Sequence, residues 1–244
     1  MVITSLENDK IKYLKKLKDY KYIKEEGKFL IETENIIDEA IKNNYLLELI
    51  LLDTYEDKYD SSIKKTIVNE KVMKHLTNMK SVPKVIGVSK LLKEKEIGNR
   101  VVVLDRVQDP GNAGTIVRNA VAFNIDTVIF TDDSVNIYND KFLRSTEGNI
   151  FKINVIRKDK EELIKFLKGK NYKIVGTKME TDTEVSDYVK PEKFALVFGS
   201  EGSGLSKEMM DACDDFIKIE MNSNVESLNV SVSSGIILYF WRGL

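Results

Sequence analysis

Apolar runs alternate with helical stretches along the second part of the chain. Runs of about four to eight apolar residues, separated in this way, are typical of a mostly parallel sheet with helices on both faces. The pattern therefore predicts an α/β domain. Its expected strands are VVVLD (101–105), DTVIF (126–130), YKIVGT (172–177), FALVFG (194–199) and the shorter, alternating FIKIEM (216–221).

The first part shows a shorter α/β alternation, which predicts a small three-layer domain. KFLIE, LLELILLD and KVIGVSK are its expected strands. Asn8 or Asp9 can cap a Lys-rich helix, and Thr33 can cap a second helix. The charged segment LLKEKEIGNR (91–100) is a plausible linker, so we place the domains at residues 1–95 and 96–244. The expected inward positions are Ile11, Leu14 and Leu17 in the first helix and Ile36, Ile37, Ala40 and Ile41 in the second.

Composition narrows the class of protein. No window approaches the ~18 uncharged apolar residues of a membrane span, and the start has no apolar signal core, so we expect a cytoplasmic protein without a membrane partner. One cysteine, Cys213, excludes internal disulfides and a cysteine-built metal site. Net charge is −1, although residues 1–28 carry eight Lys against five acids. That basic stripe is either a solvated helix face or part of a nucleic-acid surface.

Three polar segments follow the expected strands, where ligands bind in open α/β sheets. They are DPGNAGTIVRNA (109–120), GSEGSGLS (199–206) and ESLNVSVSSG (226–235). Singly, each is explained by a turn or a helix cap: Asn112 can cap a helix beginning near Ala113, and Asn229 can cap the last helix. Three such segments in one sheet favour a site. Glycines at 111, 114, 199, 202 and 204 permit sharp turns and close approach to a ligand.

Ordinary nucleotide and hydrolase motifs are excluded. The first segment lacks the G-x-G-x-x-G of a dinucleotide fold, and the second has Leu205 where a phosphate loop needs Lys. A Ser-His-Asp triad is excluded from the second part because the single histidine, His75, lies in the first.

DRVQDPGNAGTIVRNAVAF, FALVFGSEGSGLS and IKIEMNSNVESLNVSVSSG resemble, in order, the three motifs of the SpoU (TrmH) class of SPOUT RNA methyltransferases. EGKFLIETENIIDEAI resembles the substrate-binding domain of that family, which is similar to a ribosomal-protein-type α/β fold. The resemblance implies a deep trefoil knot in the C-terminal domain, a homodimer through that domain and an RNA substrate. It also implies transfer of methyl from S-adenosylmethionine to a ribose 2′-hydroxyl, without a metal ion.

The resemblance also assigns residues. Its catalytic positions match Asn112, Arg118, Glu201, Ser227 and Asn229, and its cofactor contacts match Thr177, Gly199, Gly204, Ile219, Met221 and Leu228. Because guanidinium is not deprotonated in proteins, we expect Arg118 to bind RNA phosphate or to stabilise the developing alkoxide rather than to act as the base.

The chain departs from the family pattern at three places. Glu220 replaces the usual Pro before Met221, the Glu-Gly of the first domain reads Glu32-Thr33, and Glu147 replaces a small residue before Gly148. The last helix has Ser231, Ser234 and Leu238 on one face beside Gly235, which suits either a close approach of backbone or cofactor, or a tightly packed core helix.

Ribosomal RNA is the expected substrate, by analogy with two-domain members of the family. The alternatives are a tRNA ribose methyltransferase, a base methyltransferase of the same fold and a non-catalytic RNA-binding protein.

Overall fold

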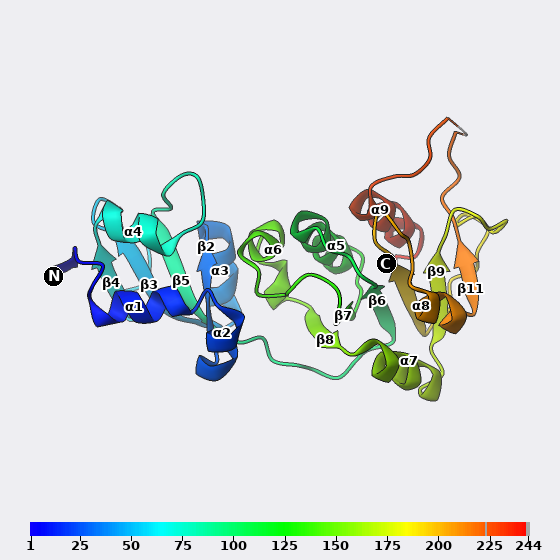
Figure 1. Cartoon of the computed structure of the whole chain (residues 1–244), viewed down its shortest axis with the longest axis horizontal. Helices are drawn as coiled ribbons and strands as arrows, with labels where there is room; N and C mark the ends of the chain where they lie inside the picture. Colours follow the sequence, from blue (N-terminus) through cyan, green and yellow to red (C-terminus); the bar gives the residue numbers. More distant parts are fainter. Residues whose placement is uncertain (223, 243–244) are drawn as a thin grey trace. The chain divides into compact units, whose positions relative to one another are not determined.

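The computed structural model describes residues 1–222 and 224–242. The chain divides into two compact units, Met1–Lys93 and Glu94–Leu244 (Figure 1). Each unit has its own sheet and its own hydrophobic core. No helix among these residues combines the length and the apolar character needed to cross a membrane.

The N-terminal unit contains a mixed five-stranded sheet within the described residues, in the order β1-β4-β3-β5-β2. β5 runs antiparallel to both of its neighbours, and the other pairs are parallel. The elements are β1 (Val2–Ile3), α1 (Asp9–Lys16), α2 (Tyr20–Glu26), β2 (Lys28–Glu32), α3 (Glu34–Lys42), β3 (Leu46–Leu52), β4 (Lys65–Val68), α4 (Glu70–Leu76) and β5 (Val85–Lys90).

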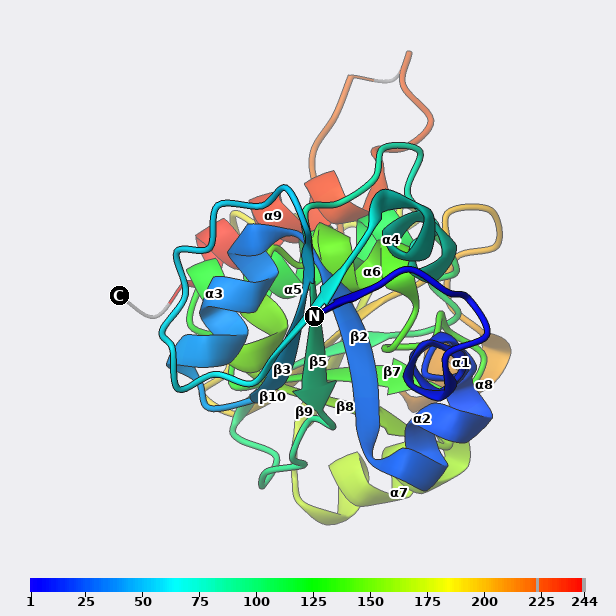
Figure 2. The ribbon, with the colours of Figure 1, turned by 90° about the vertical axis from the view of Figure 1, so that its left-hand side faces the viewer.

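Helices cover both faces of this sheet, as the sequence pattern predicts (Figure 2). Leu14 of α1 and Met73 of α4 share one core cluster with Ile50 of β3, while α3 packs on the opposite face through Ile36 and Ile37. The expected inward residues of α1, Ile11, Leu14 and Leu17, are buried. In α3, Ile36, Ile37 and Ala40 are buried and Ile41 is partly exposed.

The two expected N-caps differ in outcome. Asn8 caps α1, because its side chain accepts a hydrogen bond from the Lys10 N–H at 3.0 Å. Thr33 precedes α3 but makes no side-chain capping bond, so that expectation is wrong. Its backbone has φ 84° and ψ 142°, close to a region that essentially only glycine adopts. The Gly-to-Thr departure therefore places a β-branched residue where the chain bends in a glycine conformation.

The C-terminal unit contains a six-stranded, fully parallel sheet within the described residues, in the order β11-β9-β10-β6-β7-β8. Its strands are β6 (Arg100–Leu104), β7 (Thr127–Thr131), β8 (Asn154–Lys158), β9 (Lys173–Thr177), β10 (Phe194–Phe198) and β11 (Asp215–Ile217). Its helices are α5 (Pro110–Ala122), α6 (Asp140–Ser145), the 3₁₀ turn η1 (Asn149–Phe151), α7 (Lys160–Gly169), α8 (Lys207–Ala212) and α9 (Val230–Phe240).

Helices lie on both faces of the sheet (Figure 1), and apolar side chains pack between the helices and the sheet. Leu163 of α7 and Met209 of α8 pack with Val103 and Val197 in one core cluster. On the other face, Phe142 of α6 meets Phe130 edge-to-face at 5.3 Å. Trp241, which follows α9, meets Phe194 in the same way at 4.8 Å. Aromatic pairs of this geometry add about 0.5–1.5 kcal/mol each beyond simple burial.

The small residues of α9 pack against α5. Asn119 of α5 donates from Nδ2 to the Ser231 carbonyl at 2.9 Å and to the Ser234 hydroxyl at 2.8 Å. A Cβ added at Gly235 would lie 3.3 Å from the Asn119 Nδ2 atom. This face of α9 therefore packs closely against α5, which agrees with both alternatives, the close approach of another segment and the tightly packed helix.

The order of strands reverses between β6 and β10. From β6 the chain proceeds outward to β7 and β8, whereas the strands on the other side are β10, β9 and β11. Phe198 is paired with Leu104, so the two central strands end at the same level. Such a reversal leaves a crevice at the carboxyl ends, which is where ligands bind in open α/β sheets.

Candidate functional site

A cavity of about 470 Å³ lies at this carboxyl edge. Its walls come from the segments after β9, β10 and β11 and from the start of α9, which are far apart in sequence. The volume falls within the range of about 300–1,000 Å³ usual for small-molecule sites. The lining includes apolar residues (Phe198, Leu205, Met210, Ile217 and Ile237) and polar or charged residues (Lys178, Glu180, Glu201, Lys218 and Asn229).

All six predicted cofactor residues line this cavity: Thr177, Gly199, Gly204, Ile219, Met221 and Leu228. Thr177 ends β9 and donates its hydroxyl hydrogen to the Val197 carbonyl at 3.0 Å, which ties the ends of β9 and β10 together. Among the predicted catalytic residues, Glu201, Ser227 and Asn229 also line it.

The glycine-rich segment after β10 closes on itself. Ser200 and Gly204 exchange backbone hydrogen bonds of 3.0 and 2.9 Å, and Gly204 has φ +61°, a conformation that glycine adopts without strain. A Cβ on Gly199 would lie only 2.2 Å from the Gly204 carbonyl carbon, so the ring closes only with glycine at 199. Gly202 has no heavy atom within 4 Å of an added Cβ, and its φ is not positive.

Asn112 lies in the first turn of α5 and does not cap that helix. The cap is Asp109, whose carboxylate accepts the Asn112 N–H at 2.9 Å, and the helix begins at Pro110. The Lys141 ammonium at 2.9 Å and this N–H hold the pKa of Asp109 below its ordinary value. The capping alternative for Asn112 is therefore wrong, and its side chain is available for other contacts.

Gly111 and Gly114 do not form a ligand-binding turn, contrary to the expectation. Both lie within α5, and neither has positive φ. A Cβ on Gly114 would lie 2.5 Å from the Ser145 Cβ atom, so this glycine permits close packing of α5 against α6.

Side chains from all three motif segments meet at the rim of the cavity. Asn112 donates from Nδ2 to the Glu201 carboxylate, and Asn229 donates from Nδ2 to the Asn112 Oδ1 atom at 3.0 Å. Asn229 is also the N-cap of α9, since its Oδ1 accepts the backbone N–H groups of Ser231 and Val232. The capping interpretation of Asn229 is thus confirmed, and the same side chain also reaches Asn112 at the rim of the cavity.

The direction of these hydrogen bonds is set by the helix. Because Oδ1 of Asn229 faces the N–H groups of α9, its Nδ2 must face Asn112. Asn112 then presents Oδ1 to Asn229 and its amide hydrogens to Glu201. Since an amide nitrogen only donates and an ionised carboxylate only accepts, the orientation of each group follows from the previous one.

Arg118 stands apart from this cluster. It lies six residues after Asn112 on α5, its side chain is exposed, and it does not line the cavity. The structure therefore brings Asn112, Glu201, Ser227 and Asn229 to one edge and leaves Arg118 on the surface of α5.

Several lining residues were missed by the sequence interpretation, including Lys178, Glu180 and Lys218. Lys178 directly follows β9 and Lys218 directly follows β11. The rule that sites form at carboxyl ends would have found them had it been applied to every strand. Among the described residues, no group of three or more His, Cys, Asp or Glu side chains is arranged to hold a metal ion.

Comparisons with known proteins agree with this architecture. Residues 99–239 match the SpoU rRNA Methylase family, and residues 8–87 match the MRM3-like substrate binding domain. The chain is 31% identical to the 23S rRNA (guanosine(2553)-2'-O)-methyltransferase RlmP of Bacillus subtilis, over 99% of both chains. It is also 31% identical to the 23S rRNA (adenosine(1067)-2'-O)-methyltransferase of Streptomyces azureus, over 71% of this chain and 67% of that one.

Solved structures share the fold along almost the whole chain. A crystal structure of an RNA 2'-O ribose methyltransferase matches with a TM-score of 0.84 and 25% identity, over 98% of this chain and 97% of the other. The AdoMet-bound rRNA methyltransferase from Sinorhizobium meliloti has a TM-score of 0.83 at 24% identity, over 98% and 96% of the two chains, and supports the fold alone.

The parallel sheet, with a cavity at its carboxyl edge, is the α/β fold of SPOUT methyltransferases. More narrowly, this chain belongs to the SpoU rRNA methylase family, with an MRM3-like substrate binding domain at its N-terminal side.

Proposed function

We propose that this protein transfers a methyl group from S-adenosylmethionine to a ribose 2′-hydroxyl of ribosomal RNA. The observation that best supports this proposal is the hydrogen-bonded cluster of Asn112, Glu201 and Asn229. The cluster lies at the rim of the cavity, and the segments that contain Glu201 and Asn229 also line that cavity. The names of the Bacillus subtilis and Streptomyces azureus relatives, both 23S rRNA 2'-O-methyltransferases, support ribosomal RNA as the substrate.

The cavity fits S-adenosylmethionine. Phe198, Ile217 and Ile237 offer apolar surface for a flat purine ring, while Lys178, Glu180 and Lys218 supply charged groups for a polar tail. The open space beside Gly204 lets a ligand approach the backbone. We assign Thr177, Gly199, Gly204, Ile219, Met221 and Leu228 to holding the cofactor. The AdoMet-bound Sinorhizobium meliloti structure shares this fold.

When bound, S-adenosylmethionine supplies a methyl group on a positively charged sulfonium. The protein must hold the ribose hydroxyl in line with that methyl and assist loss of its proton. The fixed amides of Asn112 and Asn229 are suited to orienting the hydroxyl, and Glu201 keeps Asn112 in position. Ser227 lines the cavity beside Asn229 and contributes a hydroxyl at the same rim.

Arg118 is assigned to the RNA rather than to the cofactor. It is exposed on α5, away from the cavity lining, and a guanidinium recognises phosphate through paired donors. In this role Arg118 binds an RNA phosphate near the reacting ribose or stabilises the developing oxyanion.

The N-terminal unit is proposed to bind RNA through α1 and α2. Lys12, Lys16, Lys21 and Lys24 are exposed there, and Lys24 lies 4.7 Å from the centre of the Tyr20 ring. Lysines interleaved with aromatic rings suit phosphates and unstacked bases. Replacing Lys16, Lys21 and Lys24 with Ala should make the plot of log RNA affinity against log salt concentration less steep, by the amount expected for the loss of about three phosphate contacts. An unchanged slope would show that these lysines do not contact RNA phosphates.

Dimerisation is proposed through the C-terminal unit. Val232, Tyr239 and Phe240 of α9 are half-exposed, and large exposed apolar side chains on one helix are typical of interaction surfaces. Analytical ultracentrifugation of the Tyr239→Ser, Phe240→Ser double variant should then show a shift from dimer to monomer.

We also propose the trefoil knot and a cytoplasmic location. The path from β11 at the sheet edge back to α9, which packs on α5 beside the sheet centre, supports a threaded C-terminal segment. Stretching single molecules from both ends should give a final length shorter than the full contour. The proposed ribosomal RNA substrate supports the proposal of a cytoplasmic location.

Methyl transfer decides the proposed function. Purified protein, radiolabelled S-adenosylmethionine and ribosomal RNA should yield label in nuclease-resistant 2′-O-methylated dinucleotides. Arg118→Ala should fold normally and lose transfer. Label on transfer RNA only, label on a base, or tight RNA binding with no uptake of cofactor would each replace the proposal with the corresponding alternative.

A further inference from the structure

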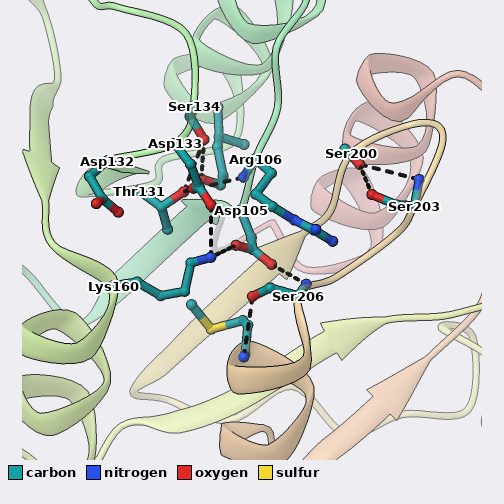
Figure 3. Close-up of polar contacts among 12 residues, drawn as sticks. Asp105, Arg106, Thr131, Asp132, Asp133, Ser134, Lys160, Ser200, Ser203 and Ser206 are labelled. Carbon is teal, nitrogen blue, oxygen red and sulfur yellow. Dashed lines mark hydrogen bonds and ion pairs between the residues drawn. The ribbon is translucent and has the colours of Figure 1, made fainter.

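The end of β6 carries a second charged cluster (Figure 3), and its residues are not among those that line the cavity. Asp105 follows the last residue of β6 and is completely buried. Its Oδ1 atom lies 3.3 Å from the Lys160 ammonium, and Lys160 also contacts the Asp133 carboxylate at 2.8 Å. A buried carboxylate is costly unless it is paired, and here the paired charge is supplied from the start of α7.

The other oxygen of Asp105 reaches the glycine-rich segment. Asp105 Oδ2 accepts the backbone N–H of Ser206 at 2.5 Å, although the two residues are 101 positions apart. Ser206 ends the segment and is the N-cap of α8, where its hydroxyl accepts the Met209 N–H. Asp105 thus holds the backbone of the residue at which the segment ends and α8 begins.

Arg106 holds the same segment at a second point. Its backbone has φ 59° and donates to the Thr131 hydroxyl, which turns the side chain toward the segment (Figure 3). The Arg106 Nη2 atom donates to the Gly204 carbonyl at 3.3 Å. That carbonyl also accepts the Ser200 N–H, so Arg106 adds a donor to the bond that closes the ring.

Two consecutive residues of one strand end therefore fix two points of the segment, Gly204 and Ser206. Between them lies Leu205, and both Gly204 and Leu205 line the cavity. Asp105, Arg106, Lys160 and Asp133 themselves do not line it. None of the four side chains is therefore placed to contact a ligand in the cavity.

We infer that Asp105 and Arg106, with Lys160 and Asp133 balancing the buried carboxylate, are positioning residues that clamp residues 199–206 in the shape that binds S-adenosylmethionine. This inference rests on the proposed function. Loss of the clamp lowers the affinity for the cofactor. At saturating cofactor the bound ligand itself holds the segment, including Glu201, in place, so the rate is unchanged.

The test compares Arg106→Ala, Arg106→Lys and Asp105→Asn with a matched control, Asp126→Asn. Asp126 also accepts a backbone N–H and pairs with an arginine, Arg100, but at the opposite end of β6. Calorimetry with S-adenosylmethionine and with S-adenosylhomocysteine gives Kd, and steady-state assays give KM and kcat. Hydrogen exchange over 199–206, measured without cofactor, reports the clamp itself.

Arg106→Ala should raise Kd and the KM for S-adenosylmethionine about tenfold at unchanged kcat, as expected for one charge-assisted hydrogen bond. Arg106→Lys should recover part of the affinity, since lysine can still donate to the Gly204 carbonyl. Asp105→Asn should raise the Kd for S-adenosylmethionine and speed hydrogen exchange in residues 199–206. Asp126→Asn should change neither the Kd nor the exchange rate.

Unchanged Kd and exchange in Arg106→Ala would overturn the inference while leaving the proposed function intact. Arg106→Ala tests the inference even if Asp105→Asn does not fold. Because Arg106 is only partly buried, its replacement should leave the protein folded. If the wild-type protein binds neither S-adenosylmethionine nor S-adenosylhomocysteine, both the proposed function and the claim that the clamp shapes a cofactor site would be overturned. Exchange over 199–206 would then still decide whether the clamp exists.

Discussion

The substitution Gly199→Ala probes the closed ring after β10. The added Cβ would lie 2.2 Å from the Gly204 carbonyl carbon, and ordinary contact begins at 3.4 Å, so the backbone must move by about 1.2 Å. Such a movement breaks the two hydrogen bonds between Ser200 and Gly204. At about 1 kcal/mol each, their loss costs about 2 kcal/mol, or roughly a thirtyfold weaker affinity for S-adenosylmethionine.

Gly202→Ala is the matched control, because its added Cβ meets no heavy atom within 4 Å and its φ is not positive. Both variants and the wild type are titrated with S-adenosylmethionine by calorimetry, and their unfolding temperatures are measured without ligand. Gly199→Ala should bind about thirtyfold more weakly while Gly202→Ala binds normally. Equal affinities in the two variants would show that the ring does not shape the site.

Three further predictions concern other parts of the chain. Thr33→Gly should stabilise the protein by about 1 kcal/mol in chemical denaturation, since it relieves a glycine-type backbone conformation, whereas Thr33→Ala should give no comparable gain. Asn112→Ala should lower kcat about 100-fold with an unchanged melting temperature, because Asp109 and not Asn112 caps α5; an equal fall in stability would contradict this. Because the pKa of Asp109 is lowered in the folded protein, its stabilising effect is present above the unfolded pKa of about 3.9 and disappears as pH falls through the folded value. Asp109→Asn should therefore be less stable than wild type at pH 7, by less than about 1 kcal/mol at this exposed pair, and the difference should vanish in urea titrations near pH 2.

Periodicity predicted most of the fold. The strands expected at VVVLD, FALVFG and KFLIE are observed as β6, β10 and β2, with the first two ending one residue earlier than expected. Fully buried strands are continuously apolar, which makes them easy to predict. β8 was missed, since NVIRK carries polar ends and has only two apolar residues in sequence. The strand predicted at FIKIEM (216–221) is too long, because β11 pairs with β9 only as far as Ile217.

Local patterns did not predict how distant segments combine. The sequence predicts that Asn229 can cap the last helix, but it does not predict that the same amide also contacts Asn112, which depends on the distance between the two segments. Likewise, Asp105 looks like an ordinary strand end in the sequence. Its partners Lys160 and Ser206 are 55 and 101 residues away, so only the parallel sheet brings them together.

The register of β6 against β10 has a consequence for how activity arises during folding. Leu104 and Phe198 are neighbours across the centre of the sheet but are separated by most of the C-terminal unit in the chain. Closing so long a loop is slow, and Asp105 and Arg106 cannot hold residues 204 and 206 until it is closed. Binding of a ligand to the folded state alone also shifts the folding equilibrium toward that state. Cofactor uptake should therefore be the last property gained on refolding, and free cofactor should protect the whole unit from proteolysis.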